Sequence, residues 1–265
     1  MKNITIISKP TPKAKHAEKK LRETLELIKI PENQSFIITV GGDGTMLGAI
    51  KQNHGRDVIF VGISAGTLGF LQTVEIEDIE KLATAIEDQS YSLINAPLLE
   101  VLAEENGKLK HVAYGFSDVA IDRAGPRAVH LNLHISGSTG NFIGDGVLFA
   151  TPLGSTAYNL SVGGPIIDSE SENVFVVTPN NPHVSLLYSS LQRPHVMAAS
   201  RQVEVGISEE NSRERPARVI VDGATVIDNV EGKLVVTLSD KKIKLMTLSR
   251  DAFASRIEQK RLGRY

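Results

Sequence analysis

Apolar and polar positions in the first third of the chain form short buried runs separated by stretches of helical spacing. Ile4 to Ile7 form the first apolar run, and Leu21, Leu25 and Ile28 then recur as on one face of a helix. Phe36 to Val40 are mostly β-branched or aromatic residues, which is typical of a strand covered on both faces by helices. The pattern therefore predicts a succession of β-α units.

The same alternation continues through one more unit and then stops. Val58 to Ile63 predict a third strand, and residues 76–86 predict a helix with its apolar positions on one face. After Pro97 the pattern is one of short strands separated by hairpin signals such as Glu105-Asn106-Gly107-Lys108 and Ser136-Gly137-Ser138-Thr139-Gly140. The predicted strands of this half are Leu98–Ala103, Leu109–Tyr114, Asp118–Arg123, Val129–Ile135, Gly146–Thr151, Val174–Val177, Val203–Ile207, Arg218–Val221 and Leu234–Leu238.

These two patterns predict an α/β protein with two domains, for which a chain of 265 residues is long enough. Residues 1–95 are expected to form a Rossmann-like α/β domain, and residues 96–245 an all-β, sandwich-like domain. Residues 246–265 form a tail in which Asp251 to Arg261 have a helical pattern. We expect this tail to return to the first domain.

Two glycine-rich loops follow predicted strands of the first domain. Gly41-Gly42-Asp43-Gly44-Thr45 comes directly after Val40 and before a helical run that starts near Met46, and a second loop spans Ser64 to Phe70. Ligands bind at such strand ends in open α/β sheets. Glycines let the backbone approach a ligand closely, and the amides that open a helix point toward an anion. The first loop is therefore suited to phosphate groups.

Asp43 is the unusual member of that loop. A fixed negative charge repels phosphates unless it accepts a proton, binds a metal or holds a hydroxyl. The structural alternative is that Asp43 only caps the following helix.

A second constellation lies in the β-rich half, where Thr151 to Ser161 follow a strand that is preceded by Gly144-Asp145-Gly146. Ser155 or Thr156 is a candidate helix N-cap. An aromatic face among neutral hydrogen-bonding groups suits a nucleoside. The side chains expected to contact it are Asp145, Tyr158, Asn159 and Ser161. The structural alternative is a capped junction between a strand and a helix.

Together these stretches resemble the NAD kinase family. The GGDGT loop is shared by a wider superfamily that includes diacylglycerol and sphingosine kinases and phosphofructokinase, whereas Gly144 through Ser161 is similar to the dinucleotide site of NAD kinases. The resemblance covers most of the chain, whose length fits the compact bacterial form. It implies transfer of the γ-phosphoryl of ATP, or of inorganic polyphosphate in some members, to the adenosine ribose 2′-hydroxyl of NAD, giving NADP. It also implies a divalent cation, Mg²⁺ or Mn²⁺, and a homo-oligomer, either a dimer or, commonly, a tetramer.

The resemblance assigns roles to particular residues. It makes Asp43 the general base or the group that orients the hydroxyl, with Gly42, Gly44 and Thr45 beside the phosphates. Phosphoryl transfer depends more on alignment and charge neutralisation than on a strong base. The other substrate contacts that the resemblance implies are Ser117, Asp118, Asp145, Thr156, Ala157, Tyr158, Asn159 and Ser161.

Three positions depart from the family pattern. Ser117-Asp118 stands where an Asn-Glu or Asn-Asp pair is usual, and serine lacks the paired donor and acceptor of an amide. Ile143 replaces a basic residue that often precedes the GDG segment, and Ala224 replaces the amide of a late Asp-Gly-Gln segment. We expect these changes to affect the affinity and pose of the ligand.

Composition and charge exclude several classes of partner and of site. The net charge of -2 offers no broad basic surface for nucleic acid, whose binding depends on phosphate neutralisation. The chain has no cysteine, which excludes disulfides and thiolate zinc sites. Met1-Lys2 leads straight into a strand-like run rather than into a signal peptide or spanning helix, so a soluble cytoplasmic protein without membrane partners is expected. His130 and His134 share a strand face, but we expect no metal site there without a third ligand.

Two alternative functions remain open at this point. A lipid kinase of the diacylglycerol type shares the GGDGT loop but gives no role to Tyr158 and its polar neighbours. A dinucleotide-binding sensor without catalysis is motivated by Ser117 and Ile143. A Walker-type cradle is excluded because the chain contains no GxxxxGK[ST] motif.

Overall fold

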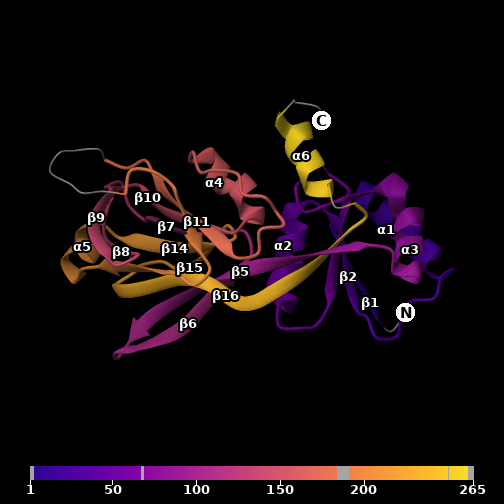
Figure 1. The fold of residues 1–265 in the computed structure, drawn as a ribbon, viewed down its shortest axis with the longest axis horizontal. Coiled ribbons are helices and arrows are strands. Elements are labelled where there is room, and N and C mark those ends of the chain that lie inside the picture. Colours follow the sequence, from indigo (N-terminus) through magenta and orange to yellow (C-terminus); the bar gives the residue numbers. More distant parts are fainter. Residues whose placement is uncertain (1–2, 67–68, 184–190, 250, 262–265) are drawn as a thin grey trace. The chain divides into compact units, whose positions relative to one another are not determined.

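The computed structural model describes residues 3–66, 69–183, 191–249 and 251–261. The chain divides into two compact units. The first contains the residues up to Ala96 together with the C-terminal stretch from Lys242, and the second contains Pro97–Lys241. Strands β5 (Ser92–Glu105) and β16 (Gly232–Thr247) contribute residues to both (Figure 1).

The first unit is a parallel sheet with helices packed against it, as the β-α pattern predicts. Its elements are β1 (Ile4–Ser8), α1 (Pro12–Leu25), β2 (Phe36–Gly41), α2 (Asp43–Asn53), β3 (Ile59–Ser64), β4 (Val74–Glu75), a 3₁₀ turn over Ile76–Asp78, α3 (Ile79–Asp88), the end of β16 and α6 (Ala252–Arg261). The strands pair in the order β1-β2-β3, and the last residues of β16 add a further parallel strand beside β3.

The two strands that lead into the glycine loops are the most deeply covered. Every residue of β2 and of β3 is buried. The buried faces of α1 and α3 supply the layer that packs against these strands. This arrangement confirms the predicted α/β class and places both glycine loops at the carboxyl ends of adjacent parallel strands.

The second unit consists mainly of two groups of antiparallel strands. One sheet has the order β12-β11-β10-β7-β14-β15, and the other pairs β16-β13-β8-β9, with the hairpin β5-β6. The remaining bounds are β6 (Lys108–Gly115), β7 (Asp118–Arg123), β8 (Val129–Ile135), β9 (Ser138–Gly144), β10 (Gly146–Ala150), a 3₁₀ turn over Leu153–Thr156, α4 (Tyr158–Ser161), β11 (Val174–Asn180), β12 (His195–Ala198), β13 (Gln202–Ile207), α5 (Glu209–Glu214), β14 (Ala217–Val221) and β15 (Ala224–Ile227). One apolar core fills this unit, in keeping with the predicted β-rich half.

The hairpin signals form tight turns because their residues tolerate positive φ. Asn106 and Gly107 have φ of 53° and 74°, and Ser136 and Gly137 have φ of 51° and 86°. Asp222 and Gly223 form a third turn of this kind between β14 and β15. Within the described parts of the chain, no helix is both long enough and apolar enough to span a bilayer.

Candidate active site

The first glycine loop connects β2 directly to α2, which begins at Asp43 rather than near Met46. A Cβ atom on Gly41 would lie 2.3 Å from the Thr45 hydroxyl oxygen, so any larger residue here would displace the Thr45 side chain. A Cβ atom on Gly42 or Gly44 would have no atom within 4 Å. The backbone at these two positions is therefore open to the approach of a ligand.

Asp43 bridges the two glycine loops. Its Oδ2 accepts a hydrogen bond from the backbone N–H of Phe70 at 3.0 Å, and its Oδ1 accepts one from Leu71 at 2.9 Å. The N-cap of α2 is Gly42, which makes no side-chain capping bond, so the capping alternative for Asp43 is wrong. Of the predicted second loop, Thr67 and Leu68 lie outside the described residues.

Gly69 makes the bridge possible. A Cβ atom there would lie 2.5 Å from Asp43 Oδ1 and 3.0 Å from its Cγ. Two amides fix the plane of the carboxylate, and each oxygen keeps one further lone pair that can accept from a hydroxyl. The arrangement suits a group that aligns a nucleophile.

The second constellation folds differently from the prediction. Ser155 Oγ donates to the Pro152 carbonyl at 2.6 Å, and Thr156 Oγ1 donates to the Leu153 carbonyl at 3.2 Å. Neither hydroxyl caps α4, whose N-cap is Ala157. The cap prediction is wrong because a 3₁₀ turn precedes the helix, and its own carbonyls take both hydroxyls.

Asn159 is fully buried and its amide is committed to the protein. Nδ2 donates to the carbonyls of Ser155 and Pro165 at 3.0 and 2.9 Å, and Oδ1 accepts from Thr178 Oγ1 at 2.6 Å. These bonds hold the turn together, and the contact of Asn159 with a ligand stays a prediction. Of the other predicted contacts here, Thr156 is buried, whereas Ala157, Tyr158 and Ser161 are exposed.

Tyr158 opens into a polar cavity of about 380 Å³ in the second unit. The cavity brings together two predicted residues, Asp145 and Tyr158, with four that sequence reasoning missed. The missed side chains are Asp122, Arg123, Asn180 and Arg218. Asp122 could have been found, because it lies on β7 with the same strand parity as Asp118, so the two face the same side of the sheet.

Hydrogen bonds and burial set the electrostatics of this cavity. Asn180 Nδ2 donates to the Tyr158 hydroxyl at 3.0 Å, and that hydroxyl makes a longer contact of 3.5 Å with Asp122 Oδ2. Burial raises the pKa of Asp122, and burial together with the Asp122 charge raises the pKa of Tyr158. Arg123 Nε pairs with Asp145 Oδ1 at 2.8 Å. The tyrosine ring is thus anchored at its hydroxyl end.

Asp222 holds the segment that carries Ser117 and Asp118. Its carboxylate accepts from the backbone N–H groups of Phe116, Ser117 and Asp118 at 2.9, 2.7 and 3.1 Å. Sequence reasoning gave Asp222 no role, since an Asp-Gly pair indicates a turn and amide acceptors leave no sequence signal. Ile143, one of the departures from the family pattern, is buried in β9.

Asp118 is a buried carboxyl beside another carboxylate. Only 8% of it is exposed, and Ser117 Oγ donates to its Oδ2 at 3.1 Å. Burial first, and then the charge of Asp222, raise the pKa of Asp118 to about 6, although the Ser117 hydroxyl lowers it. The protonated form is therefore the one that folding favours.

Replacing Asp118 by asparagine is expected to flatten the pH dependence of stability. A raised pKa in the folded state gives a contribution that is complete below the unfolded pKa and is lost as pH rises through about 6. Between about pH 4 and pH 7, the free energy of unfolding of the unmodified protein should fall relative to Asp118→Asn by up to about 3 kcal/mol. Urea denaturation across this range measures the difference, and parallel profiles would contradict it.

No described group of three or more His, Cys, Asp or Glu could hold a metal ion. Mg²⁺ is commonly bound through substrate phosphates and waters with one or two carboxylates. The donors present therefore fit a cation that arrives with a nucleotide, with Asp43 as a single carboxylate beside it.

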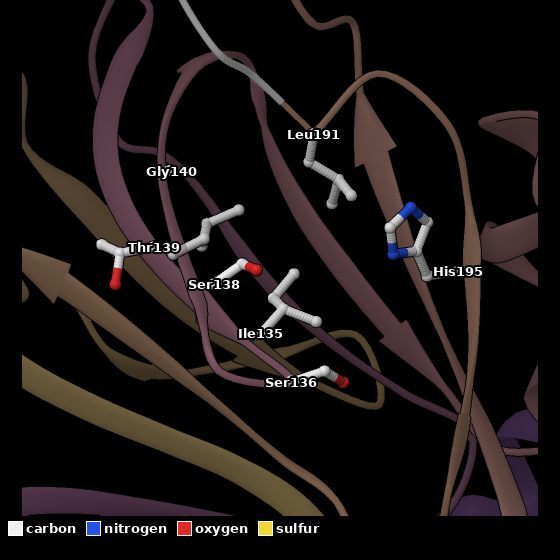
Figure 2. Close-up of a pocket in the computed structure, with 8 residues that line it drawn as sticks. Ile135, Ser136, Ser138, Thr139, Gly140, Leu191 and His195 are labelled. Carbon is white, nitrogen blue, oxygen red and sulfur yellow. The ribbon is translucent and has the colours of Figure 1, made fainter.

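A second cavity of about 370 Å³ lies beside the β8-β9 hairpin and β12 (Figure 2). Leu133, Ile135 and Leu191 supply its apolar side chains, with His195 beside them. None of the site residues predicted from the sequence is among its described lining residues.

Comparison with protein families matches both halves of the chain. The model of the ATP-NAD kinase N-terminal domain matches residues 4–91, and that of the ATP-NAD kinase C-terminal domain matches residues 118–248. These ranges contain the loop that carries Asp43, the residue Asp118 and the turn that carries Tyr158.

Individual proteins are similar over most of their length. The NAD kinase of Sulfurimonas denitrificans is 34% identical over 221 residues, which cover 82% of this chain and 74% of that protein. Yeast NADH kinase complexed with NADH has a similar fold, with a TM-score of 0.81 at 22% identity over 99% of this chain and 87% of the other. An NAD kinase from Archaeoglobus fulgidus in complex with ATP gives a TM-score of 0.75 at 22% identity over 97% and 98%. At 22% identity, the likeness to these two structures shows that this chain has the same fold.

Proposed function

The chain belongs to the ATP-NAD kinase family, and from this premise we propose that it transfers the γ-phosphoryl of ATP to the 2′-hydroxyl of the adenosine ribose of NAD, giving NADP. The observation that carries the proposal is the Asp43 carboxylate, oriented by two amides on a turn whose glycines leave open backbone. A protein that only binds dinucleotides has no evident use for a carboxylate at such a position.

Asp43 acts in this proposal by accepting a hydrogen bond from the ribose hydroxyl and aligning it with the phosphoryl group. A loose transition state places little demand on base strength, so a carboxylate with fixed orientation meets the requirement. Gly42, Gly44 and Thr45 lie beside the phosphates, where the opening amides of α2 face the negative charge. A divalent cation, Mg²⁺ or Mn²⁺, enters with the phosphoryl donor and neutralises its charge.

The polar cavity of the second unit is proposed to hold NAD. The exposed ring of Tyr158 stacks on a base, while Asp145 and Ser161 accept or donate hydrogen bonds to the dinucleotide. Ser117, Asp118, Thr156, Ala157 and Asn159 support this site, the buried ones by fixing its walls. We further propose that the protein is cytoplasmic and forms a homo-oligomer, either a dimer or a tetramer. Light scattering would measure the molar mass of this assembly.

An assay for NADP formation tests the function. The protein is incubated with NAD and either ATP or inorganic polyphosphate, each with Mg²⁺ and with Mn²⁺, and NADP is detected by a coupled dehydrogenase. NADP formation with at least one donor is expected. Binding of NAD in calorimetry without turnover on any donor would favour the sensor instead, and phosphorylation of diacylglycerol in place of NAD would favour the lipid kinase.

Replacing Tyr158 by alanine should mainly weaken NAD binding. Stacking of a base on an aromatic ring contributes about 1–3 kcal/mol, so KM for NAD is expected to rise about 5- to 140-fold with a smaller change in kcat. Tyr158→Phe is the matched control, since it keeps the ring and loses only the hydroxyl, with its bond from Asn180 and its longer contact with Asp122. An unchanged KM in the alanine variant would mean that the ring serves packing alone.

A further inference from the structure

Arg256 is a buried cation on α6, near the end of the chain. Its side chain is 8% exposed. A buried charge is costly unless it is paired and hydrogen-bonded. Arg256 Nη2 donates to the backbone carbonyl of Gln72 at 2.8 Å and forms an ion pair with Glu75. Both partners belong to the segment that follows the second glycine loop.

The start of this segment, residues 70–72, also binds the first glycine loop. Phe70 and Leu71 donate their amides to the Asp43 carboxylate, and the next residue, Gln72, donates its side-chain amide to the carbonyl of Gly42 at 2.9 Å. Three consecutive residues therefore bind two neighbouring positions of the first glycine loop. Arg256 contacts the third of them.

Contacts with β2 and β3 also hold Gln72 in place. It is 1% exposed, and Thr39 Oγ1 donates to its Oε1 at 3.4 Å. A Cβ atom on Gly62 would lie 2.6 Å from Gln72 Oε1 and 2.5 Å from the Leu71 carbonyl oxygen, so the segment is pressed against β3. With β3 on one side, the guanidinium of Arg256 fixes the segment from α6.

We propose that Arg256 is a positioning residue for Asp43, holding residues 70–72 so that their donors keep the carboxylate in its reactive orientation. Arg256 contacts no substrate in this proposal and acts only through the segment. The proposal rests on the function proposed above, because its kinetic consequence requires Asp43 to align the ribose hydroxyl. Its structural consequence can be measured without turnover.

The kinetic test replaces Arg256 by methionine, which fills similar volume without donors. A small misplacement of a reacting group can lower the rate about 100-fold, so kcat for NADP formation is expected to fall about 10- to 100-fold while KM for NAD stays within about threefold. Arg22→Met is the control, since it removes an exposed arginine paired with Glu18 on α1 in the same unit. Restoration of kcat in Arg256→Met by added guanidinium ion would support the role, whereas unchanged kcat in this variant would overturn it.

The structural test measures amide hydrogen exchange at Phe70 and Leu71 in the full chain. Loss of the Arg256 contact is expected to raise both exchange rates at least about tenfold, while the amide of Val61 in β3 keeps its rate. Arg256→Lys keeps the charge but not the planar fork, so it is expected to give a smaller increase and serves where Arg256→Met does not fold.

Exchange separates the two proposals. An unmodified protein that makes no NADP contradicts the function, while faster exchange at Phe70 and Leu71 in the variants still supports the positioning role. Unchanged exchange in both variants overturns the role even if the protein is an active kinase.

Discussion

Replacing Asp43 by asparagine is expected to lower kcat for NADP formation by about 10²- to 10⁴-fold, the usual cost of losing a group that handles a reacting proton. The asparagine side chain has nearly the same shape, but one of its two positions becomes an NH₂ group. That NH₂ would face the N–H of Phe70 or Leu71, two donors in contact, so the side chain loses one fixing bond as well as its charge.

The effect should be confined to turnover. KM for NAD is expected to stay within about fivefold, because the dinucleotide is held mainly by the cavity that Tyr158 lines. Asp57→Asn is the matched control, as Asp57 is an aspartate of the same unit that is 87% exposed and pairs with Lys244. Turnover near that of the unmodified protein in Asp43→Asn would reject the role of the carboxylate.

Replacing Gly69 by alanine is expected to lower kcat about 100-fold with little loss of stability. The added Cβ atom would lie 2.5 Å from Asp43 Oδ1, and nothing else is as close to it. The end of a side chain can move away at small cost, so the protein folds, but the carboxylate must leave its two amides. Activity falls for that reason while the melting temperature changes by only a few degrees.

Gly66→Ala supplies the comparison for this experiment. Gly66 belongs to the same loop, and a Cβ atom there would have no atom within 4 Å. Its kcat is expected to stay within about twofold of the unmodified value. Equal losses in the two variants would indicate that the loop tolerates no substitution for general reasons, and would contradict a specific displacement of Asp43.

Elements with a strong local pattern could be predicted from the sequence. β7 and β8 begin and end where the alternation predicts, and β2 is buried on both faces, because strands of this kind are specified by their own residues. Strands β9, β12 and β15 and helix α5 were not predicted. They are short or polar, so their own composition specifies them weakly. The three strands are held by pairing with β8, β11 and β14.

Only side chains with a recognisable chemistry could be assigned to the candidate site from the sequence. Asp43, Asp145 and Tyr158 were predicted because a carboxylate among glycines, and an aromatic residue among neutral hydrogen-bonding groups, indicate a ligand site. The amides of Phe70 and Leu71 and the clamp at Asp222 could not be found, since backbone donors carry no sequence signal. Asn180 reaches Tyr158 from a strand 22 positions away, a proximity that only the fold creates.

A structure of the protein crystallised with NAD tests the central claim most directly. The proposed function predicts that the Asp43 carboxylate lies within about 2.6–3.2 Å of the 2′-oxygen of the adenosine ribose, still bonded to the amides of Phe70 and Leu71. Bound NAD whose adenosine ribose lies far from Asp43, in crystals that also contain the phosphoryl donor and Mg²⁺, would contradict it.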